Sequence, residues 1–206
     1  MSADGDRRAR TVAGDFAYTE CPRWHDGRLW FSDQYLGWVY AMTAGGDVEA
    51  IAEVPGRPAG LGWSPDGRLA VVSMDRHEVL VLEGGDLRPV ADLTPHHPGP
   101  SNDMVVDGLG RAYVGNIGFD YYGGESPRLT CLVLADLASG RCSVAAQDLN
   151  VPNGAVITPG GRELIVAESF GHCLTAFSID PDGRLSDRRL FADLGSRVPD
   201  GICLDA

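Results

Sequence analysis

The sequence predicts an all-β fold, a β-propeller, and three features support this prediction. Its 206 residues include 27 glycines and 13 prolines, which suits many short strands joined by tight turns. A turn glycine recurs at Gly27, Gly67, Gly110 and Gly161, in steps of 40, 43 and 51 residues, and periods of about 40–50 residues are typical of propeller blades. No stretch predicts an amphipathic helix longer than two turns. A β-sandwich would also contain short strands, but the regular four-strand period favours the propeller.

The repeated unit is clearest in residues 149–168. A polar residue, Asn153, follows Pro152 and precedes a short apolar strand. Pro159, Gly160 and Gly161 then supply a tight turn, because glycine accepts a positive φ without steric cost. A second apolar strand follows, and both halves are apolar runs bounded by breaker residues, as expected of strands. The same layout recurs four more times with a different residue at its start.

Each of four units resolves into four predicted strands. By residue number, the predicted strands are 21–25, 28–32, 38–42 and 49–54 in the first unit; 60–63, 69–73, 78–82 and 88–93 in the second; 104–106, 112–115, 130–135 and 142–147 in the third; and 155–157, 163–167, 173–179 and 188–191 in the fourth.

The two ends of the chain predict further pieces of the same architecture. Residues 198–204 resemble the first strand of a fifth unit, and residues 11–16 resemble the outer strand that would complete a last blade. We therefore expect a flexible N-terminus over residues 1–10 and a single propeller domain over residues 11–206. Four blades and one strand do not close a ring, so we expect a C-terminally truncated, open arc with exposed apolar edges.

Composition excludes several classes of protein. A net charge of −12 argues against a nucleic-acid partner, since such binding depends on clustered Lys and Arg. No apolar run approaches about 18 residues and no apolar segment follows the N-terminus, so we expect neither a membrane span nor a secretory signal. The five cysteines are odd in number and lack C-x-x-C spacing, which suggests free thiols in a cytoplasmic protein. Cys131 and Cys142 could face each other across a hairpin, but we expect no disulfide.

The residues that begin each unit are the candidate site. The first strand of a propeller blade is innermost, so the residues at its start converge on one mouth of the central channel. These mouth positions are Glu20, Ala59-Gly60, Asn102-Asp103, Asn153 and Asp200. Carboxylates brought together repel each other and need a cation, and oxygen ligands suit Ca²⁺, Mg²⁺ or Mn²⁺ better than Zn²⁺. Each position alone would be an ordinary turn former, but three together at the blade period favour a site.

Four short stretches resemble one known family, the senescence marker protein (regucalcin)/gluconolactonase/luciferin-regenerating-enzyme group. They are Glu20-Cys21-Pro22-Arg23-Trp24, Asn102-Asp103-Met104-Val105-Val106-Asp107, Pro152-Asn153-Gly154 and Pro199-Asp200-Gly201. The resemblance extends from about residue 11 to the end of the chain. It implies a six-bladed propeller with one divalent cation in its channel, of which this chain would hold about four blades and the first strand of a fifth.

The resemblance also implies roles for particular residues. Glu20, Asn153 and Asp200 would bind the metal, with Asp200 doubling as the acid and base. Asn102 would contact substrate or a metal-bound water, Asp120 would be a substrate-binding carboxylate, and Asp103 would support the site. Ca²⁺ is the expected ion, with Mg²⁺, Mn²⁺ or Zn²⁺ as alternatives.

This chain departs from the family pattern at two positions. Pro100 stands where sugar-lactone members commonly carry Arg, which weakens the assignment of any specific aldonolactone. Cys21 replaces a glycine, a change that we expect to affect packing only.

The expected activity is hydrolysis of a small-molecule lactone by a metal-dependent, gluconolactonase-like lactonase, a carboxylic ester hydrolase. The metal would act as a Lewis acid on the lactone carbonyl while Asp200 moves the proton of the attacking water. No G-x-S-x-G motif supports a serine nucleophile. A related esterase or phosphotriesterase, or a non-catalytic propeller that binds calcium or a protein partner, remains an alternative. A truly truncated chain could be inactive.

Several connecting loops could also border the site. The insertion over residues 116–128 predicts either a lid that closes over substrate or a rigid loop packed by its own aromatic residues. We expect His96 and His97 to be solvated loop histidines. Four further residues in connectors could line the pocket: Tyr35, His77, Phe170 and His172. Asp33, Asp75 and Glu168 are expected to accept hydrogen bonds from loops.

Overall fold

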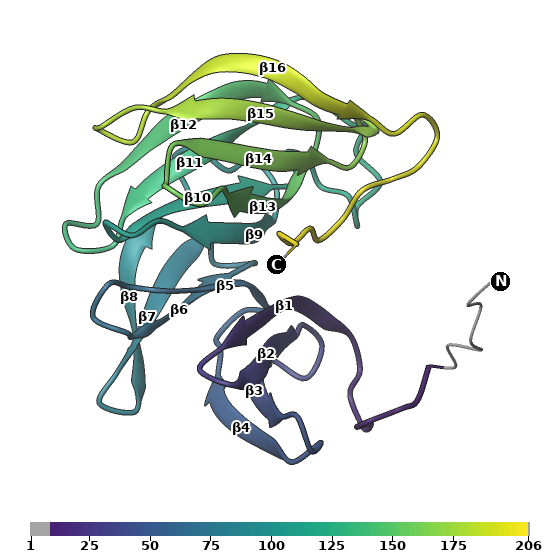
Figure 1. The fold of residues 1–206 in the computed structure, drawn as a ribbon, viewed down its shortest axis with the longest axis vertical. Helices are drawn as coiled ribbons and strands as arrows, with labels where there is room; N and C mark the ends of the chain where they lie inside the picture. The colour runs from purple at the N-terminus through teal and green to yellow at the C-terminus, as the bar shows by residue number, and fades with distance from the viewer. Residues whose placement is uncertain (1–8, 206) are drawn as a thin grey trace, which may run out of the picture.

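The computed structural model describes residues 9–205, so most of the predicted flexible segment, residues 1–8, lies outside the described residues. Sixteen strands form four antiparallel four-stranded sheets, each a blade of consecutive strands (Figure 1).

The first blade comprises β1 (Thr19–His25), β2 (Arg28–Asp33), β3 (Trp38–Thr43) and β4 (Val48–Glu53). The second comprises β5 (Pro58–Trp63), β6 (Leu69–Ser73), β7 (Glu78–Glu83) and β8 (Asp86–Asp92). The third comprises β9 (Ser101–Val106), β10 (Arg111–Asn116), β11 (Thr130–Asp136) and β12 (Cys142–Leu149). The fourth comprises β13 (Pro152–Ile157), β14 (Glu163–Glu168), β15 (Cys173–Ile179) and β16 (Leu185–Asp193).

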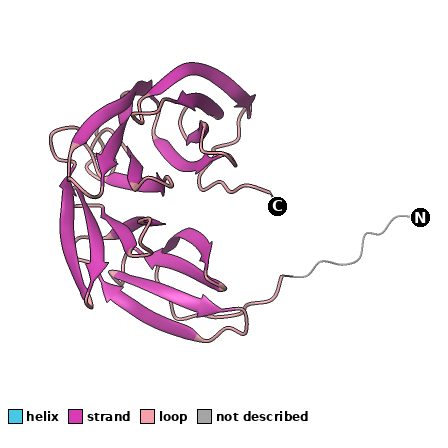
Figure 2. Ribbon diagram, turned by 60° about the vertical axis from the view of Figure 1, so that its left-hand side comes forward, coloured by secondary structure: helices cyan, strands magenta, loops and turns pink. Residues whose placement is uncertain are grey.

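The blades are arranged as an open arc (Figure 2), and the labelled strands of Figure 1 show that the first strand of each blade lies on the inside. The inner strands β1, β5, β9 and β13 pack against one another in sequence order. This confirms the predicted all-β fold, an incomplete propeller of about four blades. Among the described residues no helix is present, and none could therefore cross a membrane.

Apolar side chains fill the three junctions between neighbouring blades. Val39, Leu61 and Val71 belong to the core between the first and second blades. Val72 and Met104 belong to the core between the second and third blades, and equivalent residues join the third to the fourth. Burial of such side chains stabilises the fold by roughly 1.5–3 kcal/mol for each large residue. The arc is therefore held together blade by blade, and its inner strands keep a fixed spacing.

Every inner strand has an irregularity in its pairing near its start. The pairing register shifts between Glu20 and Arg23 in β1, and between Pro58 and Leu61 in β5. It also shifts after Pro152 in β13 and after Ser101 in β9, where the partner strand is β10. A bulge of this kind re-aims a side chain while the rest of the strand remains paired. The second residue of each inner strand thus departs from the regular pleat, and those residues are the mouth positions.

The two ends of the chain do not form strands. Residues 11–16, predicted as an outer strand, have no strand pairing; Phe16 instead packs its ring on Phe31 and Tyr40 of the first blade. None of the four described sheets includes this segment as a strand. Residues 198–204 run along β13, where Gly154 donates its N–H to the carbonyl of Asp200, but they are not paired as a strand.

All five cysteines are free thiols, as predicted. Cys142 on β12 is paired with Ala135 on β11, so it does not lie opposite Cys131. Apolar side chains are exposed on the outermost strand of the fourth blade, where Leu190 and Phe191 keep 63% and 54% of their surface accessible. This agrees with the expected apolar edges of an open arc.

Candidate active site

Four residues from the mouth positions line one cavity, which has a volume of about 230 Å³. Glu20 from β1, Asn102 from β9, Asn153 from β13 and Asp200 from the C-terminal segment all line it. The remaining lining residues are Tyr18, Gln34, Met74, Ile117, Tyr121, Tyr122, Val151, Ser169, Phe170 and Val198. Ala59, the mouth position of the second blade, does not line this cavity. The cavity therefore receives the predicted oxygen donors from three blades and from the segment after the fourth.

Glu20 and Asp200 are close enough for their charges to interact. Burial raises the pKa of Glu20, and the negative charge of Asp200 raises it further. The pKa of Tyr18 is also raised, chiefly by Glu20 and then by burial and Asp200. Two carboxylate charges in one cavity repel each other, which favours a cation between them.

Asn153 is held by a hydroxyl that sequence reasoning missed. Its Nδ2 donates to Ser169 Oγ at 3.1 Å, and Ser169 Oγ donates to the carbonyl of Pro199 at 2.8 Å. Ser169 thus connects Asn153 to the residue before Asp200, and the amide oxygen of Asn153 is not used in this contact. The signal for Ser169 was its place directly after the second strand of its blade, the place that Gln34 and Met74 hold in the first two blades.

Asp200 lies beside Asn153 because Gly154 has no side chain. A Cβ at Gly154 would stand 2.6 Å from the backbone nitrogen of Ile202 and 2.7 Å from the carbonyl oxygen of Asp200. Contacts that short are sterically forbidden, so only glycine lets the two backbones approach. The Pro152-Asn153-Gly154 motif therefore supplies one oxygen donor and the space for the other.

The corresponding residue after Glu20 is Cys21, and it takes a left-handed backbone conformation with φ of 51°. The side chain is 5% exposed, and burial holds the pKa of its thiol well above the usual range. We expected this departure from the family pattern to affect packing only. The structure adds a backbone effect at this position, because a residue with a Cβ is strained at positive φ.

Asp103 does not line the cavity, but its contacts hold two of the strands whose residues do. Its Oδ1 accepts from Arg23 Nη2 at 2.6 Å and from the backbone N–H of Met104 at 2.8 Å. Burial opposes the charge of Arg23, yet Asp103 outweighs this and raises the pKa of the guanidinium. The pair fixes β1 against β9 directly behind Glu20 and Asn102.

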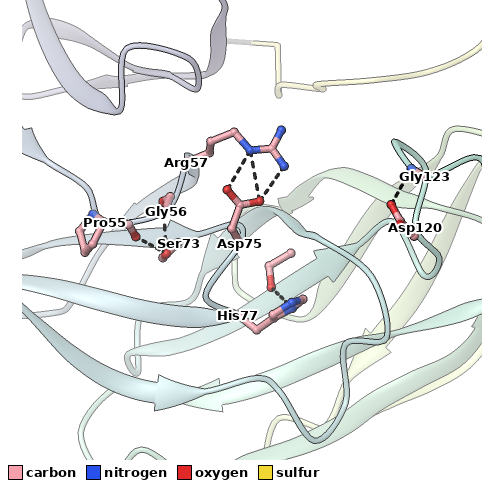
Figure 3. A network of polar contacts seen from close by, with 9 residues as sticks. Pro55, Gly56, Arg57, Ser73, Asp75, His77, Asp120 and Gly123 are labelled. Atoms are coloured by element: carbon pink, nitrogen blue, oxygen red, sulfur yellow. Dashed lines mark hydrogen bonds and ion pairs between the residues drawn. The ribbon is translucent and has the colours of Figure 1, made fainter.

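Asp120 lies apart from the other predicted residues. It is exposed, and its Oδ1 accepts from the backbone N–H of Gly123 at 2.8 Å within the loop that follows β10 (Figure 3). Asp120 is absent from the cavity lining, where the neighbouring Tyr121 and Tyr122 are found instead.

The other loop predictions had mixed outcomes. Phe170 lines the cavity, whereas Tyr35, His77 and His172 do not. Asp33 accepts four backbone N–H bonds, from Ala17, Tyr18, Tyr35 and Leu36; these outweigh its burial and lower its pKa. Asp75 accepts from Arg57, and Glu168 accepts from the backbone of Asn150, so the expectation for all three carboxylates is confirmed.

The prediction that His97 is solvated was wrong. His97 is 4% exposed, and its Nδ1 lies 2.8 Å from Ser101 Oγ. Burial, with smaller contributions from His77 and His96, lowers the pKa of His97 to about 3. His97 is therefore a neutral, buried residue that anchors the connector to β9, next to Asn102.

The donor set fits a hard divalent cation. Within residues 9–205 no group of three or more His, Cys, Asp or Glu side chains could hold a metal ion. A cation in this cavity would therefore need an amide oxygen beside the carboxylates of Glu20 and Asp200, and Asn153 has one available. Carboxylate and amide oxygens are the ligands that Ca²⁺ and Mg²⁺ prefer.

Comparison with known proteins places the chain in a family. A sequence model of the SMP-30/Gluconolactonase/LRE-like region matches residues 18–206. The pentonolactonase XacC of Haloferax volcanii is 26% identical over an alignment of 195 residues, which covers 91% of this chain and 63% of that protein. The chain thus spans less than two thirds of the length of this curated relative.

Solved structures share the fold at low identity. A gluconolactonase from Xanthomonas campestris has a TM-score of 0.79 at 22% identity, over 95% of this chain and 69% of that one. Regucalcin from Agrobacterium tumefaciens, described as a calcium-binding protein, has a TM-score of 0.70 at 18% identity, over 86% of this chain and 60% of that one. A chain from a nidogen/laminin complex has a TM-score of 0.71 at 14% identity, over 89% of this chain and 67% of that one, so the fold alone does not define an activity. The match of the family model over residues 18–206, nearly the whole chain, shows that the protein belongs to the SMP-30/gluconolactonase/LRE-like family.

Proposed function

We propose that this protein is a divalent-metal-dependent hydrolase that opens the ring of a lactone. The observation that carries the proposal is the meeting of Glu20, Asn153 and Asp200 in one cavity, where burial and then the charge of Asp200 raise the pKa of Glu20. A merely structural propeller has no need of two mutually repelling carboxylates at its channel mouth. The lactonase relatives supply the substrate class.

The residues divide the chemistry between them. Glu20, Asn153 and Asp200 would hold the cation, and the bound cation would supply Lewis acidity toward the lactone carbonyl. Asp200 accepts a proton from the attacking water and returns it to the ring oxygen as the C–O bond breaks. Asn102, on the same wall, orients the substrate through its amide. The products are the hydroxy acid and no other fragment, so the step consumes only water.

We propose Ca²⁺ as the resident ion, with Mg²⁺, Mn²⁺ and Zn²⁺ as alternatives. Three protein oxygens leave room for water and substrate oxygen, which suits the six to eight ligands of Ca²⁺. Regucalcin from Agrobacterium tumefaciens, described as calcium-binding, has the same fold. Titration of the metal-free protein with each chloride salt by calorimetry would rank the ions.

A panel of aldonolactones and aryl esters, assayed with and without chelator, tests the proposal. We expect lactone hydrolysis that chelator abolishes and that Asp200→Asn lowers by at least 100-fold. The matched control is Asp182→Asn, which changes an exposed carboxylate in the outer hairpin of the fourth blade. Turnover that survives both chelator and Asp200→Asn would refute the metal mechanism, while turnover of aryl esters alone would favour an esterase.

The fold shared with a chain of a nidogen/laminin complex motivates a second candidate, a non-catalytic propeller that binds calcium or a protein partner. It predicts calcium binding without turnover of any ester. The lactone assay separates the two candidates. Both predict calcium binding, but only the lactonase predicts release of acid from a lactone.

A further inference from the structure

Arg57 has a side-chain arrangement that the proposed chemistry does not use. It lies directly before β5 in the second blade, and its guanidinium meets Asp75 in the turn between β6 and β7. Arg57 Nη2 donates to Asp75 Oδ1 at 2.6 Å, and Nε donates to Oδ2 at 3.0 Å (Figure 3). This two-point contact fixes the plane of the guanidinium, which a single bond could not do.

The fixed guanidinium lies over the ring of Tyr122, with Cζ 4.8 Å from the ring centroid. Tyr122 belongs to the loop of residues 117–129 that follows β10 in the third blade, and its side chain lines the cavity. A cation over an aromatic face attracts it without a hydrogen bond. A residue of the second blade therefore holds the tip of a loop that starts in the third.

The rest of the loop explains why this contact matters. Its base is anchored by Phe119, which is 1% exposed and lies so close to Gly99 that a Cβ there would collide with the Phe119 backbone. Its tip is exposed: Tyr121 and Tyr122 keep 53% and 57% of their surface accessible. Tyr121 packs toward Phe170 of the fourth blade, with ring centroids 6.4 Å apart. The tip is thus held from two sides, by Phe170 and by Arg57.

We propose that Arg57, oriented by Asp75, is a positioning residue for the substrate: it holds the Tyr122 ring against the cavity and so sets the wall that a bound lactone contacts. This inference rests on the proposed lactonase function for the meaning of that wall. The side chain of Arg57 is 22% exposed and that of Asp75 is 45% exposed, so the pair lies at the rim rather than among the reacting groups. The hydrogen bonds from Arg57 lower the pKa of Asp75, which keeps the pair charged at neutral pH.

Hydrogen–deuterium exchange on the full chain without substrate tests the anchoring. Arg57→Met and Asp75→Asn are expected to speed exchange over residues 118–126 at least threefold, and Tyr122→Leu, which removes the ring that Arg57 holds, should do the same. The control is Arg88→Met, which removes an exposed arginine whose nearest carboxylate, Asp86, is 3.5 Å away. Unchanged exchange in Arg57→Met would overturn the inference, whatever the protein hydrolyses.

Kinetics test the consequence for substrate. Arg57→Met should raise KM about fivefold with kcat within twofold, because a wall that contacts both ground state and transition state contributes uniform binding. A double-mutant cycle then separates positioning from direct contact. In the Tyr122→Leu background, Arg57→Met should cause no further rise in KM. An additive effect would show that Arg57 touches substrate itself and would overturn the inference. Absence of lactone turnover in the wild type would refute the proposed function instead, since loop exchange and calcium binding are measured without substrate.

Discussion

Arg23 on β1 and Asp103 on β9 form a charged hydrogen bond of 2.6 Å that joins the first blade to the third, past the inner strand of the second. Arg23 also donates to the carbonyl of Met104, so one guanidinium contacts the two residues that follow Asn102 in the chain. The Asp103 side chain is 3% exposed. The separation of Glu20 from Asn102 therefore depends on a buried ion pair and not only on strand packing.

Removal of one partner of this pair should be costly. Arg23→Met leaves the Asp103 carboxylate buried without its cation, and we expect the free energy of unfolding to fall by about 3 kcal/mol. The double variant Arg23→Met/Asp103→Asn removes the unpaired charge and should recover at least half of that loss. Urea unfolding followed by tryptophan fluorescence measures both. A double variant no more stable than the single one would show that packing, not charge, sets the cost.

The left-handed conformation of Cys21 makes a specific prediction about two small substitutions. Cys21→Gly and Cys21→Ala both lose the buried thiol, but only glycine adopts a φ of 51° without strain. We expect the glycine variant to be more stable than the alanine variant by about 1 kcal/mol, the reverse of the usual order within a strand. Thermal unfolding of the two variants decides this, and equal midpoints would contradict the account of strain.

The close approach at Gly154 predicts loss of cation binding without loss of the fold. Gly154→Ala would push its Cβ into the backbone of Asp200 and Ile202, so we expect calcium affinity to fall at least tenfold. Gly201→Ala is the matched control, since a Cβ there meets nothing within 4 Å. Calorimetric titration and circular dichroism are the measurements. Equal affinities in the two variants would mean that Asp200 is not held by β13.

Burial of neutral His97 predicts a loss of stability in mild acid. Its pKa is about 3 in the folded protein and about 6.5 when unfolded, so the unfolded chain takes up the proton first. The stability contribution is complete above pH 6.5 and declines as the pH falls toward 3, with a loss of about 2 kcal/mol between pH 6.5 and 5. His97→Gln has no such proton, so its unfolding free energy should change less between pH 7 and 5 than that of the wild type. An identical change would refute the neutral, buried state.

Most strands could be predicted because their apolar runs and turn glycines recur at the blade period. The errors were systematic: inner strands were predicted to begin at residues 21, 60, 104 and 155, whereas they begin at Thr19, Pro58, Ser101 and Pro152. The two or three missed residues lie at the bulges, where polar residues and proline interrupt the alternation that identifies a strand. The irregularity that hid these residues from the pattern is also what turns them toward the channel.

The candidate site was predictable only in part, for a related reason. Glu20, Asn153 and Asp200 could be grouped because they share one position in the repeat. Ser169 and Arg57 act on residues of other segments, through contacts that depend on how blades sit side by side. His97 was misassigned because a Pro-flanked loop usually faces solvent, whereas in this loop the His97 side chain is buried against Ser101 at the start of β9.

Apart from Asp200, the cavity takes one chief oxygen donor from each contributing sheet, always at the second residue of an inner strand, and this has a consequence for how such proteins can diversify. A recombinant chain that receives a whole sheet from a relative would gain one new oxygen donor at the cavity, with the few lining residues beside it, and would keep the donors of the other sheets in place. Selectivity could then change one sheet at a time, without a stage at which the shared scaffold must be rebuilt.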